Sequence, residues 1–345
     1  MPQSASVITP SSSSLNVLLT SAGRRVALLR AFRDAQRALG LTGSKVVATD
    51  LTRLSSAFQD ADAAELVPRV TAVDYVDRLV EVCERHQIGL IVPLIDPELP
   101  VLAAARARLE AVGAIPVASG PETAAVSDSK RVAAAFFDRI GLRTPRVIDH
   151  GSALAGHEPF PLFLKPENGS SSIGTRPIHS VEELAHWWPR TQKPLLLELV
   201  TGVEYTVDVY VGLDGTPRCA VPRRRLETRA GEVSKGITVA DERVMSAAMT
   251  AAAALPDARG VLTFQCMVGP DGEPSFFELN ARFGGGAPLS IAAGADFPRW
   301  LLEERLGRVP AIPSPAFKHH FAMLRFDDAV FVENAGALLP EAILS

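Results

Sequence analysis

The first third of the chain alternates short apolar runs with amphipathic stretches, and this pattern restricts the fold more than any other feature of the sequence. Four apolar runs cover residues 15–20, 45–49, 89–95 and 115–118, and the stretches between them include segments with helical periodicity. Strands that alternate with helices of this length form a parallel sheet with right-handed crossovers. We therefore predict a Rossmann-like α/β domain over residues 15–120, with ligands at the carboxyl ends of its strands.

The pattern changes after Pro121, and from Glu204 onward it indicates antiparallel strands. Two apolar runs, at residues 205–210 and 218–221, flank a Gly-Leu-Asp-Gly turn. An Ala-rich helical stretch then covers residues 242–255. A chain of 345 residues suits two or three domains, so we expect an α+β region after the α/β domain.

The composition excludes several classes of protein. The net charge of −4 and the pI of about 6.0 argue against nucleic-acid binding. Three widely spaced cysteines lack metal-ligand spacing, which favours a reducing compartment. No apolar run approaches the roughly 20 residues of a membrane span, and the Ser-rich residues 1–14 lack the pattern of a signal peptide. We expect a disordered leader at residues 1–14 and a soluble, cytoplasmic protein without membrane or nucleic-acid partners.

The most informative polar residues lie in a predicted hairpin, whose strands cover residues 261–268 and 275–280. An Asp-Gly turn at residues 271–272 places Gln265 directly opposite Glu278. Residues that lie opposite each other in a ladder share one face of the sheet. The hairpin therefore presents an amide and a carboxylate side by side.

Alternation along the second strand adds Asn280 and Arg282 to this face. One carboxylate and two amide oxygens suit Mg²⁺, and an arginine beside them can clamp phosphate oxygens. The alternative is a structural hairpin whose polar side chains face solvent. Its other face would be covered by four apolar side chains, Phe264, Met267, Phe276 and Phe277.

A second signal is a lysine on an apolar strand, Lys165, followed by a loop of small residues at 168–174. The backbone N–H groups of such a loop and the lysine charge together suit a triphosphate. Because the lysine precedes the glycines, this is not a Walker A loop. An exposed flexible loop would explain the composition of residues 168–174 without a ligand, but not the lysine on the strand.

In this order the motifs resemble those of the ATP-grasp superfamily, with the pattern of the synthetase domains of the carbamoyl phosphate synthase large subunit. The resemblance extends from about Asn16 to about Arg308. It implies a Rossmann-like pre-ATP-grasp domain at residues 15–120, a small ATP-grasp subdomain at 121–197, a large subdomain at 198–310 and a C-terminal extension at 311–345.

The resemblance also implies a role for each motif. Arg282 and Lys165 would be catalytic, and Mg²⁺, with Mn²⁺ as a possible substitute, would be held by Gln265, Glu278 and Asn280. Both subdomains would contribute contacts to ATP, from Lys130, Lys165, Ser171, Ser172, Glu198, Val200, Glu204 and Arg282. Within this set the backbone at Glu198 and Val200 would contact adenine, and Glu204 would contact the ribose. Lys130 begins a predicted helix, where an exposed lysine is also common.

Two features depart from the family pattern. Many family members have a carboxylate where this chain has Gln265, although the carbamoyl phosphate synthase domains also have glutamine there. The chain has neither a glutamine-amidotransferase region nor a repeated half. It is therefore not expected to be a carbamoyl phosphate synthase itself.

Substrate contacts are expected from charged residues in two places. One is a basic stretch that contains Arg223, Arg225 and Lys235, which is also compatible with a solvated strand edge. The other is the set of carboxyl ends in the first sheet, which carry Arg24, Arg25, Asp96 and Glu98. Arginines at the start of a helix favour an anion, but they commonly point to solvent.

The implied activity is that of an ATP- and Mg²⁺-dependent ligase, which activates a small-molecule carboxylate as an acyl phosphate and transfers it to an amine. The loop at residues 284–286 would offer backbone N–H groups to the oxyanion. A homodimer is compatible with this function. The alternatives are a nucleotide-dependent kinase, an NAD-type dehydrogenase that uses Asp50 of the first domain, and a non-catalytic ATP-binding regulator.

Overall fold

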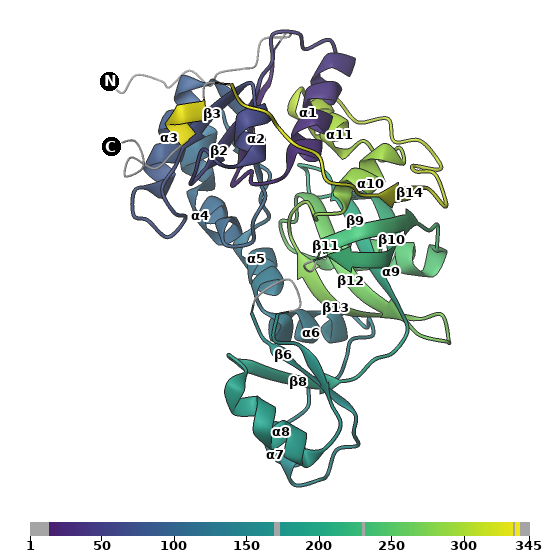
Figure 1. Cartoon of the computed structure of the whole chain (residues 1–345). Helices are drawn as coiled ribbons and strands as arrows, with labels where there is room; N and C mark the ends of the chain where they lie inside the picture. The colour runs from purple at the N-terminus through teal and green to yellow at the C-terminus, as the bar shows by residue number, and fades with distance from the viewer. Residues whose placement is uncertain (1–13, 169–172, 230–231, 334, 339–345) are drawn as a thin grey trace, which may run out of the picture. The chain divides into compact units, whose positions relative to one another are not determined.

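The structure is a computed structural model that describes residues 14–168, 173–229, 232–333 and 335–338. The chain divides into two compact units, which are described separately (Figure 1). The first unit extends to Ser119 and also contains Asp296–Ala311 and the chain from Phe326 onward. The second unit contains Gly120–Ala295 and Ile312–Arg325. Residues 1–13 of the expected leader, and the expected ATP contacts Ser171 and Ser172, lie outside the described residues.

The first unit is built on a five-stranded parallel sheet with the strand order β3-β2-β1-β4-β5. Its elements are β1 (Asn16–Thr20), α1 (Val26–Ala38), β2 (Val46–Asp50), α2 (Ser56–Asp60), β3 (Ala63–Leu66), α3 (Tyr75–Arg85), β4 (Ile88–Pro93), α4 (Glu98–Ala111), β5 (Ile115–Pro116), α11 (Phe297–Arg305) and the 3₁₀ turn η2 (Ala335–Leu338). The predicted Rossmann-like α/β fold is confirmed. Two elements between residues 51 and 73, α2 and β3, were not predicted.

The apolar runs of this unit become strands because helices cover the sheet. Strand β4 is buried along its whole length, as expected for a strand in the interior of a parallel sheet. Helix α1 buries Leu28, Leu29 and Phe32, which recur at helical spacing. Leu18, Ile91 and Leu102 join the core formed with α3 and α4. Hydrophobic periodicity therefore accounts for most of this unit.

Helix α11 belongs to the first unit although it is distant from it in sequence. It packs against α1, and Arg305 donates hydrogen bonds to the backbone oxygens of Gly89 and Gly113 at 2.8 and 3.0 Å. The domain boundaries from the sequence assigned residues up to 310 to the large subdomain. The contacts group residues 296–311 with the first unit instead, because an apolar helical face does not itself specify which core it joins.

The second unit contains two antiparallel sheets, one of six strands in the order β13-β12-β9-β10-β11-β14 and one of three in the order β7-β6-β8. Its elements are α5 (Pro121–Asp128), α6 (Lys130–Arg139), α7 (His150–Leu154), β6 (Leu162–Pro166), β7 (Arg176–Ile178), α8 (Val181–Trp187), the 3₁₀ turn η1 (Trp188–Arg190), β8 (Pro194–Glu198), β9 (Val203–Val211), β10 (Pro217–Arg229), β11 (Glu232–Thr238), α9 (Glu242–Ala254), β12 (Gly260–Val268), β13 (Pro274–Asn280), α10 (Ala287–Ala292) and β14 (Ala322–Leu324).

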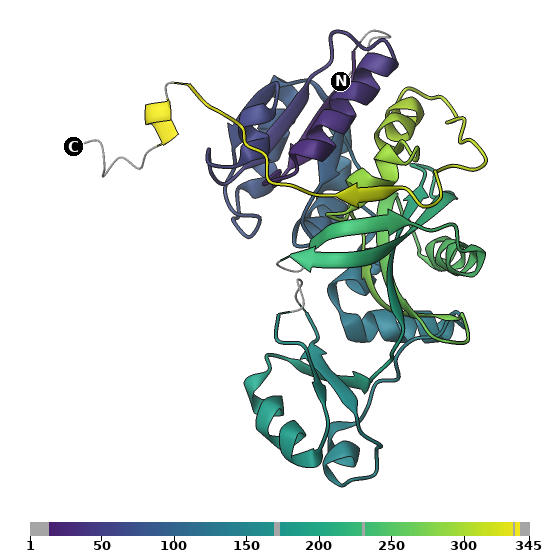
Figure 2. The ribbon, with the colours of Figure 1, turned by 45° about the vertical axis from the view of Figure 1, so that its right-hand side comes forward.

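Helices cover the six-stranded sheet on the side of its aromatic residues. Helix α6 packs against β13, where the Phe137 ring lies 6.3 and 5.4 Å from the ring centres of Phe264 and Phe276. Helix α9 packs against β9 and β10 (Figure 2). Because side chains alternate along each strand, the neighbours of these aromatic residues project from the opposite face.

The three-stranded sheet has a small core of its own. Leu162 and Leu164 of β6 are buried together with Leu184 of α8 and Leu196 of β8. Alternation along β6 then directs Lys165 to the other face. No helix in the described parts of the chain is long and apolar enough to cross a membrane.

Candidate active site

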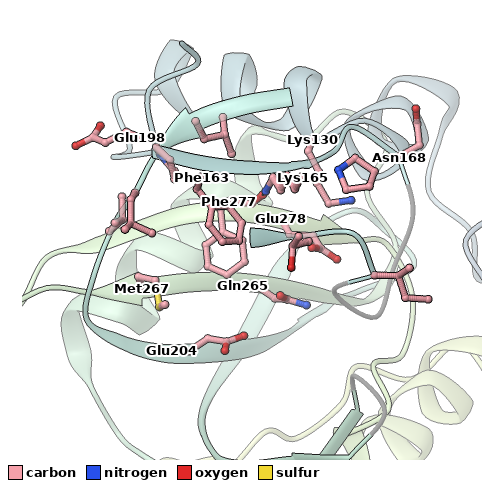
Figure 3. A pocket seen from close by; sticks show the side chains of 17 residues that line it. Lys130, Phe163, Lys165, Asn168, Glu198, Glu204, Gln265, Met267, Phe277 and Glu278 are labelled. Carbon is pink, nitrogen blue, oxygen red and sulfur yellow. The ribbon is translucent and has the colours of Figure 1, made fainter. Parts of the chain in front are cut away.

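A cavity of about 220 Å³ in the second unit is lined by residues from both of its sheets (Figure 3). Strands β6 and β8 contribute from the three-stranded sheet, and β9, β12 and β13 contribute from the six-stranded sheet. The lining includes seven of the residues expected to contact ATP or metal, namely Lys130, Lys165, Glu198, Val200, Glu204, Gln265 and Glu278. The roles assigned to them stay predictions, but the structure brings these residues together.

The β12–β13 hairpin has the predicted register at its polar end. Gln265 pairs with Glu278, and Thr263 pairs with Asn280. The Asn280 amide donates to Glu278 Oε1 at 3.1 Å, and the Arg282 guanidinium donates to Asn280 Oδ1 at 3.3 Å. A chain of polar contacts therefore links the carboxylate to the arginine.

A β-bulge corrects the prediction for the apolar residues of this hairpin. The register shifts after Gln265, so Cys266 pairs with Phe276 and the extra residue on β13 is Phe277. Phe277 and Glu278 consequently both line the cavity, as does Met267. The prediction placed Phe277 and Met267 on the opposite face, and it was wrong for both. Simple alternation fails at a bulge, and Met267 follows Gln265 by two residues and therefore shares its face.

Lys165 enters the cavity from β6 and is only 4% exposed. Its Nζ atom lies 3.5 Å from the Phe277 carbonyl oxygen and 5.4 Å from the centre of the Phe277 ring. The pKa of Lys165 is lowered to about 8, mainly by burial; the Glu278 carboxylate opposes the shift and the positive charge of Lys130 adds to it. A buried cation without a full counter-charge is suited to bind an anion.

Lys130 is held near Lys165 because the start of α6 is tied to the end of β6. Ser129 caps α6 and donates to Glu167 Oε1 at 2.7 Å. The Lys130 backbone N–H donates to the Glu167 carbonyl oxygen at 3.2 Å. Figure 3 shows Lys130 and Lys165 at the same end of the cavity as Gln265 and Glu278. This end therefore combines two cations with the proposed metal ligands.

The rest of the cavity lining is largely apolar, and the sequence analysis did not assign it to the site. Phe163, Met267 and Phe277 contribute to it (Figure 3), together with Leu197. Phe163 precedes Lys165 by two residues and Met267 follows Gln265 by two, so strand alternation from the polar candidates could have identified them. Flat apolar side chains of this kind suit an aromatic base.

The expected adenine and ribose contacts lie at the edges of this apolar lining. The Glu198 side chain is exposed and points away from the cavity, so the backbone of this residue, rather than its carboxylate, is near the ligand space. The Glu198 N–H donates to the Arg146 carbonyl oxygen at 2.9 Å. Glu204 forms an ion pair with Arg225, one of the expected substrate contacts.

The donor set fits a hard divalent cation. Glu278 supplies a carboxylate, and Gln265 and Asn280 supply amide oxygens on the same face of the hairpin. Mg²⁺ accepts such a set because it takes one or two protein carboxylates and fills its remaining positions with water and phosphate oxygens. Within the described residues no group of three or more His, Cys, Asp or Glu side chains could hold a metal. The hairpin differs from such a group because two of its three ligands are amides.

The candidates of the basic stretch on β10 and β11 lie in different surroundings, and a substrate contact by Arg225 or Lys235 stays a prediction. Arg223 is 1% exposed and donates to both carboxylate oxygens of Asp208 at 2.8 Å. A guanidinium enclosed in this way is not available to a substrate, and β10 lies between β9 and β11 rather than at a sheet edge. Lys235 is exposed and pairs with Glu227 at 2.6 Å. The sequence could not show these pairings, because the partners are distant in the chain or on a neighbouring strand.

In the first unit, Glu98 is fully buried and does not present a surface to a substrate. It accepts hydrogen bonds from Thr20 Oγ1, Ser21 Oγ and Tyr75 OH at 2.8, 2.6 and 2.6 Å. Burial raises the pKa of Glu98, and the hydroxyl donors oppose this shift. The prediction of a direct substrate contact by Glu98 is therefore corrected: Glu98 fixes the turn after β1.

The other charged candidates of the first unit differ in exposure. Arg24 is exposed, whereas Arg25 and Asp96 are partly buried. Asp50 accepts hydrogen bonds from the backbone N–H groups of Gly23 and Leu51 at 2.8 and 2.7 Å. These two bonds use Asp50 to hold the turns that follow β1 and β2, and each of its oxygens keeps a second lone pair.

Two family models match separate parts of the chain. Residues 17–118 match a PylC-like N-terminal domain, and residues 190–328 match a family described as ATP-grasp in the biosynthetic pathway with the Ter operon. A search of curated proteins gave no match.

Solved structures of similar fold cover most of this chain. The biotin carboxylase domain of Hydrogenobacter thermophilus 2-oxoglutarate carboxylase, solved with MgADP, ADP and bicarbonate, is 17% identical with a TM-score of 0.71, over 89% of this chain and 73% of that one. The L-amino acid ligase of Bacillus licheniformis is 19% identical with a TM-score of 0.64, over 88% and 76%. An ADP complex of N5-carboxyaminoimidazole ribonucleotide synthetase is 17% identical with a TM-score of 0.66, over 88% and 79%. At these identities the likeness establishes the fold.

Proposed function

We propose, from its membership of the ATP-grasp superfamily, that this chain is an ATP- and Mg²⁺-dependent ligase that joins a small-molecule carboxylate to an amine. The observation that carries the proposal is the pairing of Gln265 with Glu278 across the hairpin, with the buried Lys165 facing them from the other sheet. The relatives by fold include proteins whose names describe ligase or carboxylase chemistry, and two of their structures contain ADP.

The two parts of the cavity correspond to the two ends of ATP. The apolar part, with Phe163, Met267 and Phe277, would enclose adenine, and Glu204 would contact the ribose. Lys130 and Lys165 would contact the phosphates, where a positive charge held in a partly desolvated site is most effective. Ser171 and Ser172 remain proposed phosphate contacts from the sequence alone.

Phosphoryl transfer depends mainly on positioning and on neutralising charge. Glu278, Asn280 and Gln265 would hold Mg²⁺, which would neutralise negative charge on the phosphates. Arg282 is oriented by its hydrogen bond to Asn280, so it would contact the transferred group beside the metal ligands. Lys165 would stabilise charge that develops as the γ-phosphoryl group moves to the substrate carboxylate.

An amine would then attack the acyl phosphate, and phosphate would leave with the formation of an amide. The backbone N–H groups of residues 284–286, which follow Arg282 and Phe283, would stabilise the tetrahedral oxyanion. This mechanism requires no covalent intermediate on the protein. It is consistent with the three cysteines, whose thiols are buried and whose pKa values are raised by burial to about 12.

The decisive experiment is incubation of the purified protein with ATP, Mg²⁺ and a panel of carboxylates and amines. A ligase releases ADP and phosphate only when both substrates are present, and it yields an amide detectable by mass spectrometry. A phosphorylated product that accumulates would indicate a kinase instead. ATP binding without turnover across the panel would favour a regulator and overturn the proposal.

A further inference from the structure

A buried ion pair lies on the same face of the six-stranded sheet as the proposed metal ligands. Asp208 on β9 pairs in register with Thr263 on β12, which pairs in turn with Asn280 on β13. The neighbouring row contains Arg223 on β10, Thr206, Gln265 and Glu278. Residues directly opposite in a ladder share a face, so these two rows connect the ion pair to the metal hairpin.

The Asp208 carboxylate is surrounded by polar groups from three elements. Besides the two bonds from Arg223, Asp208 Oδ2 accepts a hydrogen bond from Ser290 Oγ of α10 at 2.6 Å. Thr263 Oγ1 lies 3.3 Å from Asp208 Oδ1 and donates to the Arg282 carbonyl oxygen at 3.0 Å. The ion pair is therefore hydrogen-bonded to α10 through Ser290, and it is in contact with Thr263, which holds the other end of the segment at Arg282.

The glycines of this segment fit closely against the same group. A Cβ atom at Gly286 would lie 2.0 Å from Arg223 NH1, and one at Gly284 would lie 3.0 Å from Thr263 Oγ1. Neither distance is tolerated without displacement of the neighbour. The backbone of residues 284–286 thus rests directly on Arg223 and Thr263, which only glycine permits here.

Stability alone does not explain a charged pair at this place. Asp208 is 0% exposed and Arg223 is 1% exposed, and the removal of two charges from water opposes much of their attraction. Apolar residues of similar volume often fill such sites with equal or greater stability. An apolar pair, in contrast, cannot form directional hydrogen bonds to the neighbouring hydroxyl groups.

We infer that Asp208 and Arg223 are positioning residues, which through Thr263 and Ser290 fix the backbone from Arg282 to Gly286 beside the metal hairpin. This inference rests on the proposed function, because the loop matters for catalysis only if Arg282 and the following N–H groups act on the transferred phosphoryl and acyl groups. It assigns Arg223 a role behind the site instead of a contact with substrate.

The test is a double variant, Asp208→Leu/Arg223→Met, which removes both charges and leaves no unpaired buried ion. We expect it to fold, to keep its KM for ATP within about threefold and to lose about 100-fold in kcat, the order of effect produced by a displacement of about 1 Å in a catalytic group. Hydrogen exchange should become faster in the backbone of residues 282–290. A matched control is Asp214→Leu/Arg218→Met, which removes an exposed pair of 2.7 Å at the other end of β9 and β10 and should change none of these quantities.

Single substitutions at Ser290 decide the question if the double variant does not fold. Ser290→Ala removes one bond and leaves both charges, and should lower kcat by about tenfold, in line with the loss of one hydrogen bond to a charged group. Ser290→Thr keeps the hydroxyl group and should have the kcat of the wild type. Wild-type kcat and unchanged exchange in a folded double variant, or in Ser290→Ala, would overturn the inference. Absence of turnover in the wild type would instead overturn the proposed function, and the exchange measurement would still decide whether the pair fixes the loop.

Discussion

The Lys165 ammonium group lies 5.4 Å from the centre of the Phe277 ring and 3.5 Å from the carbonyl oxygen of the same residue. The two residues come from different sheets, so this contact joins the two walls of the cavity. An aromatic face and one carbonyl dipole replace the water around the cation only in part, and the pKa of Lys165 falls to about 8. A phosphate group would supply the full negative charge that the contact lacks.

The affinity for ATP should therefore depend on pH near neutrality. As the pH rises through about 8, Lys165 loses its proton in the free protein and binding should weaken, by about tenfold per pH unit well above the pKa. Calorimetry with Mg²⁺ and ADP from pH 7 to 9.5 measures this directly. Lys165→Arg stays charged throughout and should bind with little dependence on pH. Equal pH dependence in both proteins would show that Lys165 is not the group responsible.

Glu278→Gln should nearly abolish turnover and leave the fold intact. The substitution removes the only carboxylate of the proposed metal site, and a loss on the order of 100-fold or more in kcat is expected when such a charge is missing. ADP release and the thermal midpoint, measured side by side, separate activity from folding. Glu273→Gln, in the exposed connection of the same hairpin, is the matched control and should behave as wild type. Normal ADP release from folded Glu278→Gln would exclude the metal assignment.

Arg24→Ala/Arg25→Ala tests whether the first unit contributes to substrate binding. These residues precede α1 at the carboxyl end of β1, where an anion is favoured by about 1 kcal/mol or more when partly buried. We expect unchanged ATP affinity and a KM for the carboxylate substrate that rises about fivefold or more. Arg30→Ala, also in α1, removes an exposed ion pair with Asp60 of α2 and should leave both constants unchanged. An unchanged KM for every substrate in the double variant would show that both arginines only face solvent.

Glu98 should make the first unit less stable as the pH rises. Its pKa is raised in the folded state by burial, so above the ordinary value of 4.5 the folded protein binds more protons than the unfolded chain. The free energy of unfolding contributed by this residue therefore decreases with pH until the folded pKa is passed. Calorimetric unfolding of wild type and Glu98→Gln at pH 5 and 8 isolates this contribution as a difference. The wild type should lose more stability than the variant over this interval, and an equal loss would contradict the assignment.

Local sequence pattern was sufficient to predict much of the fold and one strand pairing in the site. Hydrophobic periodicity identified the parallel sheet because its strands are buried on both faces, and the Asp-Gly turn fixed Gln265 opposite Glu278. Lys165 was identifiable because a charged residue interrupts an apolar strand.

Features that depend on tertiary context were not predictable from the sequence. The bulge at Phe277 reverses which face of the sheet the side chains before it point to. The local sequence contains no signal that predicts this bulge. The partner of Arg223 is Asp208 on a neighbouring strand, and only the strand order and register bring them together. Glu98 was correctly placed after the carboxyl end of β4, but the hydroxyl groups that bond to its buried carboxylate come from β1 and α3.

The position of α11 has a consequence for synthesis of the chain. Arg305 bonds to the backbone of Gly89 and Gly113, which precede it by 216 and 192 residues. On the ribosome, the α/β sheet emerges first. Helix α11 can cover α1 only after most of the remaining chain has been synthesised. Residues 120–295, which include every strand of the six-stranded sheet except β14, emerge in the meantime. Domains usually complete their folding in the order of translation. Here the N-terminal unit cannot complete its folding before residues 120–295 have emerged.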